Sequence, residues 1–201
     1  QGYPWAKQVE IHQALRDHPK VSVRSAHGVG KTRCAAWSLL WFLFTRKNSI
    51  VLTTAPTFRQ VVEILWREIR AMQGLAGLPG ECLQTALKIH DQWHALGFST
   101  DEPNRLTGFH AEDILLICDE AAGIPPAIFD AADGVLTTEG AKQFLIGNPT
   151  SGFGLFYDSH HGRAAPLWHK IAISAFDSPN FTGEKCPDSV KKRLTSVQWV
   201  Q

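Results

Sequence analysis

The stretch Ser25-Ala-His-Gly-Val-Gly-Lys-Thr32 decides how the rest of the chain is interpreted. It follows the β-branched run 20–24, which favours a strand, and leads into the apolar run 31–44, which favours a helix. A strand, a glycine turn and a helix in this order form the setting of a phosphate-binding P-loop. The pattern normally begins with glycine, and the plainer alternative is a glycine turn with an exposed lysine. We expect nucleotide binding by Ser25, Ala26, His27, Gly28, Val29, Gly30, Lys31 and Thr32.

This loop has a defined chemistry if it holds ATP. Its amides would surround the β-phosphate at the N-terminus of the following helix, where the partial positive charge favours anions. Lys31 would pair with β- and γ-phosphate oxygens, and the Thr32 hydroxyl would ligate Mg²⁺. The expected cofactors are therefore ATP and Mg²⁺.

A second motif, Ile114-Leu-Leu-Ile-Cys-Asp-Glu120, supplies two acids. Its continuous apolar run is typical of a strand buried on both faces, and ligands bind beyond the carboxyl ends of such strands. We expect Asp119 to hold Mg²⁺ through water and Glu120 to orient and activate the attacking water. Many strands end in solvated acids, so the assignment depends on the P-loop that precedes them.

Two amide side chains are further candidates. Asn148 ends the expected strand 143–146 and could contact the γ-phosphate or its water as a catalytic sensor; the alternative is an ordinary Gly-Asn-Pro turn. Gln8 lies on the expected first helix near Trp5, where its amide could both donate to and accept from adenine. The alternative for Gln8 is a solvated helix face.

The composition fits one α/β domain spanning residues 1–201, with a net charge of +1. Strands separated by helices predict a mainly parallel central sheet flanked by helices. The near-zero charge argues neither for nor against a nucleic-acid partner. Strands are expected at 20–24, 49–54, 85–89, 94–98, 114–118, 143–146 and 168–173, helices at 3–17, 31–44 and 57–72, and loops at 74–80 and 101–104.

Other features exclude some functions. The cysteines form no CxxC pair, and Cys34 and Cys118 lie in apolar runs typical of buried thiols. His160, His161 and His169 match no common zinc spacing. The longest apolar segment, residues 35–44, is too short to span a bilayer, so no membrane partner is expected.

Taken in order, the motifs resemble the ATPase half of tailed-phage large terminase subunits. The residues that carry the resemblance are Trp5 with Gln8, Ser25 to Thr32, Thr54-Ala-Pro-Thr57, Gly108-Phe-His110, Cys118-Asp-Glu-Ala121, Gly147-Asn-Pro-Thr150 and Asp177-Ser-Pro-Asn180. The resemblance implies a RecA-like P-loop fold of the ASCE class. It also implies ATP hydrolysis that drives double-stranded DNA into a procapsid.

The same resemblance implies partners and a location. A homo-oligomeric ring would work on the portal protein with the small terminase subunit, in the cytoplasm of the bacterial host and not in the mature virion. The family also has a nuclease domain; none fits after Gln201, so nuclease activity is not expected of these residues. Two other classes stay open, namely a helicase-like ATPase and a nucleotide-gated switch.

One departure from the family concerns arginine. Many terminases carry an arginine inside the P-loop, where this chain offers His27. We expect Arg105, in a loop containing Pro103 and Gly108, to act on the nucleotide of a neighbouring subunit. The alternative is a surface arginine that pairs with Asp101 or Glu102, and Arg24 is the next candidate.

Overall fold

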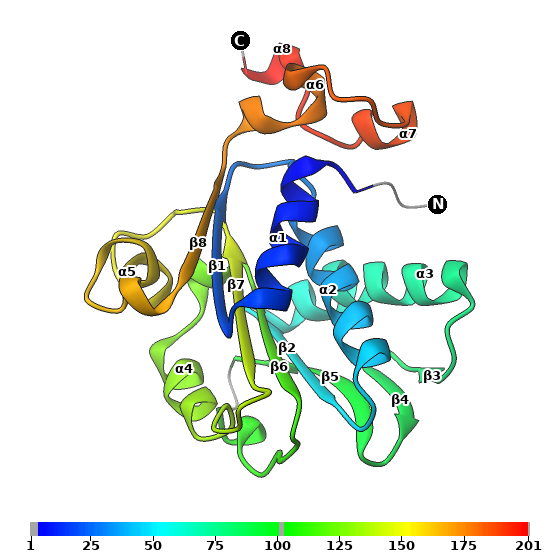
Figure 1. Cartoon of the computed structure of the whole chain (residues 1–201), viewed down its shortest axis with the longest axis vertical. Coiled ribbons are helices and arrows are strands. Elements are labelled where there is room, and N and C mark those ends of the chain that lie inside the picture. Colours follow the sequence, from blue (N-terminus) through cyan, green and yellow to red (C-terminus); the bar gives the residue numbers. More distant parts are fainter. Residues whose placement is uncertain (1–3, 101–102, 201) are drawn as a thin grey trace.

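The computed structural model describes residues 4–100 and 103–200, and for Asn104 and Arg105 it describes the backbone only. Within these ranges the chain forms a sheet in the order β3-β4-β5-β2-β6-β7-β1-β8 with helices on both faces (Figure 1). The strands are β1 (Lys20–Ser25), β2 (Ile50–Ala55), β3 (Glu81–Cys82), β4 (Ala86–His90), β5 (Trp93–Ser99), β6 (Ile114–Asp119), β7 (Lys142–Gly147) and β8 (His169–Ile173). The strands from β5 to β8 in that order are parallel, which confirms the predicted mainly parallel α/β fold.

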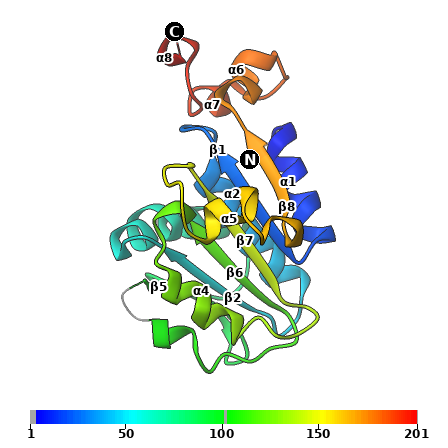
Figure 2. The same cartoon turned by 90° about the vertical axis from the view of Figure 1, so that its left-hand side faces the viewer.

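Helices cover the two faces unequally (Figures 1 and 2). One face carries α1 (Ala6–Asp17), α2 (Lys31–Thr45) and α3 (Trp66–Ala76), and the other carries α4 (Pro126–Asp133) and α5 (Leu155–His161). Each face has its own cluster of buried apolar side chains. Helix α2 is apolar over most of its surface because it lies between the sheet and its two neighbouring helices.

The remaining helical segments are short. They are the π-helical turn η1 (Gln60–Leu65), the 3₁₀ turns η2 (Pro103–Leu106), η3 (Ala121–Gly123), η4 (Ala165–Leu167) and η5 (Ala175–Asp177), and the helices α6 (Pro179–Thr182), α7 (Asp188–Lys191) and α8 (Val197–Val200). The last three helices gather at one end of the domain, beyond the end of β1 that leads into α2 (Figure 1). In the described ranges, no helix combines the length and apolar character needed to cross a membrane.

Most predicted elements are confirmed, including the hairpin of β4 and β5, and two boundaries were wrong. The helix expected at 57–72 consists of η1 followed by α3, and α3 continues to Ala76. Gly74, assigned to a loop, therefore lies inside α3. The helix ends at Gly77, whose φ of +60° gives the left-handed cap that glycine adopts easily. Sequence patterns also missed α4, α5 and the short helices after β8.

Candidate nucleotide-binding site

The stretch from Ser25 to Thr32 has the predicted strand–loop–helix setting. Strand β1 ends at Ser25, Gly28 and Gly30 have φ angles of +66° and +82°, and α2 begins at Lys31. These left-handed angles explain both glycines, since other residues rarely adopt them. The loop therefore directs the N-terminus of α2 toward the carboxyl edge of the sheet, a geometry suited to an anion.

Lys31 lies at the centre of the candidate site. Its side chain is buried, and Nζ donates to Asn148 Oδ1 at 2.7 Å and to the Ala26 carbonyl at 3.3 Å. Nζ also lies 3.8 Å from Glu120 Oε1. Asn148 in turn donates from Nδ2 to the Ser25 carbonyl at 2.8 Å. The structure thus brings three predicted residues together over the loop.

Asp119 and Thr32, the two residues predicted to hold a metal, lie in contact; their role in metal binding stays a prediction. The Thr32 hydroxyl donates to Asp119 Oδ2 at 3.3 Å, and Asp119 is 3% exposed. Burial, and secondarily the charge of Glu120, raise the pKa of Asp119 to about 6. The described residues contain no group of three or more His, Cys, Asp or Glu placed to hold a metal. One carboxylate and one hydroxyl fit Mg²⁺, which takes few protein ligands and completes its shell with water and phosphate.

Glu120 has a backbone conformation unusual for a residue other than glycine. Its φ and ψ angles are +50° and +47°, in the left-handed region. Gly147 makes room for this turn, because a Cβ at 147 would lie 2.8 Å from the Ala121 nitrogen. Such strained residues cluster at functional sites. The turn brings the Glu120 carboxylate toward Lys31.

Gln8 lies beside the loop. It is buried, and its Nε2 donates to the Gly30 carbonyl at 3.4 Å. It borders a pocket of about 370 Å³. That volume is within the range of small-molecule sites. The other lining residues are Gly30, Thr32, Arg33, Ile64, Arg67, Glu68, Leu75, Ser189, Val190, Arg193 and Leu194. The solvated-face alternative for Gln8 is wrong, and its contact with adenine stays a prediction.

The C-terminal segment contacts the P-loop. The sequence patterns did not predict this contact. The Thr195 amide donates to the Gly28 carbonyl at 2.9 Å, and its hydroxyl donates to the His27 carbonyl at 2.5 Å. Asn180 holds this segment by donating to the carbonyls of Lys191 and Thr195 at 3.0 and 2.9 Å. Asn180 belongs to Asp177-Ser-Pro-Asn180, one of the motifs that carry the resemblance, but a local motif does not predict this long-range contact.

The structure describes the surroundings of one of the two candidate arginines. Arg105 belongs to η2, which packs against α4, and its side chain lies outside the described residues. Asp101 and Glu102, its proposed alternative partners, also lie outside them. Arg24 is directed to the face of the sheet covered by α5, where Nη1 lies 3.2 Å from His161 Nε2. A transition-state arginine therefore stays a prediction.

Comparison with known proteins gives a sequence relative. No protein-family model matches the chain. Its sequence is similar to that of the probable large terminase subunit of Enterobacteria phage P7, with 27% identity over 193 residues that cover 87% of this chain. The chain spans 39% of the length of that relative.

Solved structures share the fold. The fold is similar to that of the large terminase from a thermophilic bacteriophage, with a TM-score of 0.73, 15% identity, and coverage of 98% of this chain and 52% of that one. It is also similar to the large terminase ATPase domain of Thermus phage P74-26, with a TM-score of 0.67, 20% identity, and coverage of 87% and 82%. The predicted P-loop fold is thus confirmed, and in both sequence and fold the chain is similar to large terminase subunits of bacteriophages.

Proposed function

We propose that the chain hydrolyses Mg-ATP and thereby drives double-stranded DNA into a procapsid. The observation that carries the proposal is the convergence of Lys31, Asn148 and Glu120 over a P-loop, beside the pair Thr32 and Asp119. The thermophilic bacteriophage terminase, similar in fold, has been solved in complex with ADP and with ATP-gamma-S. That likeness supports a nucleotide as the ligand of the site.

The residues divide the chemistry between them. Lys31 would exchange Asn148 for phosphate oxygens and stabilise the charge that develops during transfer. Glu120, a third exposed and 3.8 Å from Lys31, can orient a water and accept its proton. Asn148, released from Lys31, would sense the γ-phosphate. Thr32 and Asp119 would hold Mg²⁺, which supplies charge neutralisation of the phosphates when bound.

The wider assembly belongs to the same proposal. We infer a homo-oligomeric ring on the portal protein, served by the small terminase subunit, in the bacterial cytoplasm at the procapsid. Residues 1–201 would act as one ATPase domain without nuclease activity. With no arginine in the P-loop itself, a monomer should turn over slowly, because the missing charge would come from a neighbour.

Phosphate release tests the proposal. The chain is assayed with ATP, with and without Mg²⁺, and with and without linear double-stranded DNA. The expected result is hydrolysis that requires Mg²⁺ and rises when DNA is added. Tight ATP binding with slow turnover that DNA does not change would instead indicate a nucleotide-gated switch.

A further inference from the structure

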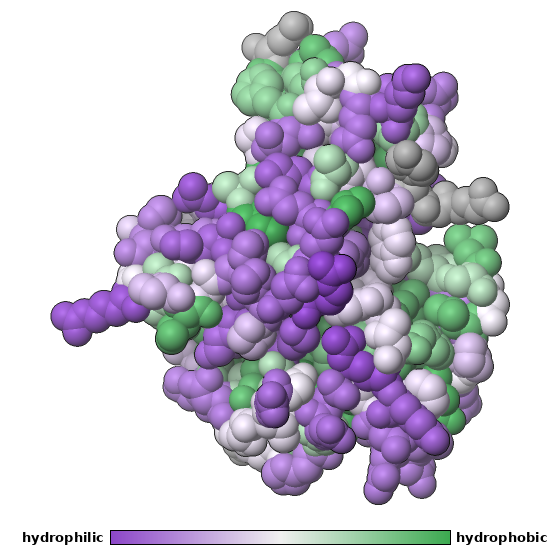
Figure 3. Space-filling view, viewed as in Figure 1, coloured by the Kyte–Doolittle hydropathy of each residue, from purple (hydrophilic) through white to green (hydrophobic). Residues whose placement is uncertain are grey.

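The loop that follows Asn148 presents an aromatic side chain to solvent. Phe153 is 81% exposed, in a loop whose other contacts are local, such as the 3.3 Å bond from its amide to Ser151 Oγ. Gly152 and Gly154 flank it with open space at their Cα atoms, and Gly154 has a φ of +90°. Hydrophilic residues prevail on the face in Figure 3, and among the exposed apolar side chains Phe153 is one of the most exposed, together with Leu75 at 82%.

Positive charge gathers next to this loop. Arg24 and Lys170 lie on the face of β1 and β8 that α5 covers, because Lys170 is in register with Ser22, whose hydroxyl contacts Ser159 and His160. His161 lies 3.2 Å from Arg24. Within the described residues, neither Arg24 nor Lys170 forms an ion pair. On α5 itself, Asp158 is an exposed carboxylate.

The pKa of His160 reflects its burial and the positive charge of Arg24 and Lys170. Burial, followed by the charges of Arg24, His161 and Lys170, lowers its pKa to about 4. Tyr157, which is 38% exposed, adds a second ring and packs 4.8 Å from the His161 ring. Helix α5, which carries Tyr157 and His161, lies beside the edge strand β8, which carries Lys170 (Figures 1 and 2).

We propose that this surface, comprising Phe153, Tyr157, His161, Arg24 and Lys170, contacts the backbone of double-stranded DNA. Arg24 and Lys170, which have no acidic partner among the described residues, suit phosphates, which supply most of the affinity of DNA-binding proteins. The ring of Phe153 would pack against deoxyribose. A single projecting ring suits the backbone better than the successive stacking that single strands require. This inference rests on the proposed function.

The position of the surface couples it to the nucleotide. Arg24 immediately precedes the P-loop and is in register with Gly147, next to Asn148. Asn148 begins the loop that carries Phe153 and bonds to both Lys31 and Ser25. A phosphate that takes Lys31 from Asn148 would therefore act at the start of the loop that carries Phe153 and next to Arg24.

Fluorescence anisotropy with a labelled duplex tests the surface. Lys170→Glu should weaken binding about tenfold and reduce the slope of log affinity against log salt by about one, as loss of a phosphate contact does. Phe153→Ala should weaken binding about fivefold, within the range for an aromatic contact. Leu167→Ala is the matched control, because Leu167 is 67% exposed and precedes β8 at the opposite edge. Its duplex affinity should equal that of the wild type.

The outcomes separate this inference from the proposed function. ATP affinity and melting temperature are measured for each variant, and both should stay at wild-type values. If both variants bind duplex normally while DNA still stimulates hydrolysis, the surface is wrong and the proposed function stands. If the wild type neither binds duplex nor responds to it, both fail. A preference for single strands that Phe153→Ala abolishes would overturn the backbone contact.

Discussion

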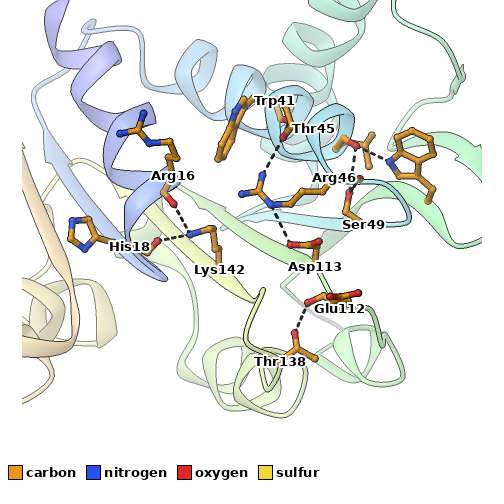
Figure 4. A network of polar contacts seen from close by, with 12 residues as sticks. Arg16, His18, Trp41, Thr45, Arg46, Ser49, Glu112, Asp113, Thr138 and Lys142 are labelled. Carbon is orange, nitrogen blue, oxygen red and sulfur yellow. Dashed lines mark hydrogen bonds and ion pairs between the residues drawn. The ribbon is translucent and has the colours of Figure 1, made fainter.

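At the amino edge of the sheet, Arg46 is surrounded by partners that the fold itself supplies (Figure 4). Its Nε lies 3.2 Å from Asp113 Oδ1, Nη1 donates to Thr45 Oγ1 at 3.1 Å, and the guanidinium lies 4.8 Å from the Trp41 ring centroid. Lys142 nearby donates to two backbone carbonyls, at 3.0 and 3.3 Å. Arg46 is therefore paired within the fold, while burial and the charge of Arg46 lower the pKa of Lys142.

At the carboxyl edge the charges are buried and incompletely matched. Lys31 is bonded to neutral oxygens and lies 3.8 Å from Glu120, while the hydrogen bonds that Asp119 receives from described residues come from Thr32 and the Glu120 amide. The raised pKa of Asp119 indicates that its ionised form is unfavourable there. The ion pair of Arg46 at the amino edge therefore stabilises the fold. The charges of Lys31 and Asp119 at the carboxyl edge are instead available to a ligand. Such sites commonly sacrifice stability for function.

The substitution with the largest expected effect tests whether the site at the carboxyl edge needs an arginine from a neighbouring subunit. In assembled rings, Arg105→Ala should lower ATP turnover by about 10³-fold or more, the scale of a missing arginine finger. The decisive measurement mixes Arg105→Ala subunits with Glu120→Gln subunits. Recovered hydrolysis at mixed interfaces would demonstrate action across the boundary. Full activity of Arg105→Ala rings would exclude this residue and leave Arg24 as the next candidate.

Lys31→Ala removes the cation from the same edge. We expect turnover to fall by about 10²–10³-fold and ATP binding to weaken, because the developing phosphate charge loses its main donor. Phosphate release and nucleotide titration measure the two effects. Lys142→Ala is the control at the opposite edge and should leave turnover unchanged. Wild-type hydrolysis by Lys31→Ala would refute the P-loop assignment.

Glu120→Gln should separate binding from chemistry. ATP should still bind, since the amide keeps the size of the side chain, while hydrolysis falls by about 100-fold through loss of a general base. Binding and single-turnover rates are measured on the same preparation. If Glu120→Gln lost as much ATP affinity as Lys31→Ala, this separation of binding from chemistry would be wrong.

The sequence predicted the local parts of this site well. The P-loop and the strand that ends at Asp119 could be recognised because a few adjacent residues specify each one. The contacts of Gln8 with Gly30, and of Thr195 with His27 and Gly28, join segments far apart in the chain and have no local pattern.

Helix boundaries were less predictable. Gly74 favours a loop but lies inside α3. The segments after β6 and β7 also contain loop-forming residues, yet they form α4 and α5 because their apolar side chains pack on the sheet. The left-handed conformation of Glu120 was likewise unpredictable, because it depends on the space left by Gly147 on another strand.

The smallest effect contrasts two aspartates at opposite edges. The native pKa of Asp119 is raised from 3.8 to about 6, so the folded chain binds more protons than the unfolded chain in that window. Stability without ligand should therefore decrease as the pH rises through it. Asp119→Asn should remove this slope and increase the free energy of unfolding at neutral pH by about 1–2 kcal/mol.

Asp113→Asn should act in the opposite direction. It removes the partner of Arg46 from a partly exposed ion pair, so we expect a loss of about 0.5–1 kcal/mol. Urea unfolding at acid and neutral pH measures both variants, and hydrolysis assays should show lost activity only for Asp119→Asn. Because Mg²⁺ and nucleotide offset the charge of Asp119, adding them should stabilise the wild type and Asp113→Asn more than Asp119→Asn. If both substitutions destabilise the chain without ligand, the ionised form of Asp119 is not unfavourable in the fold. The contrast between the two edges would then be wrong.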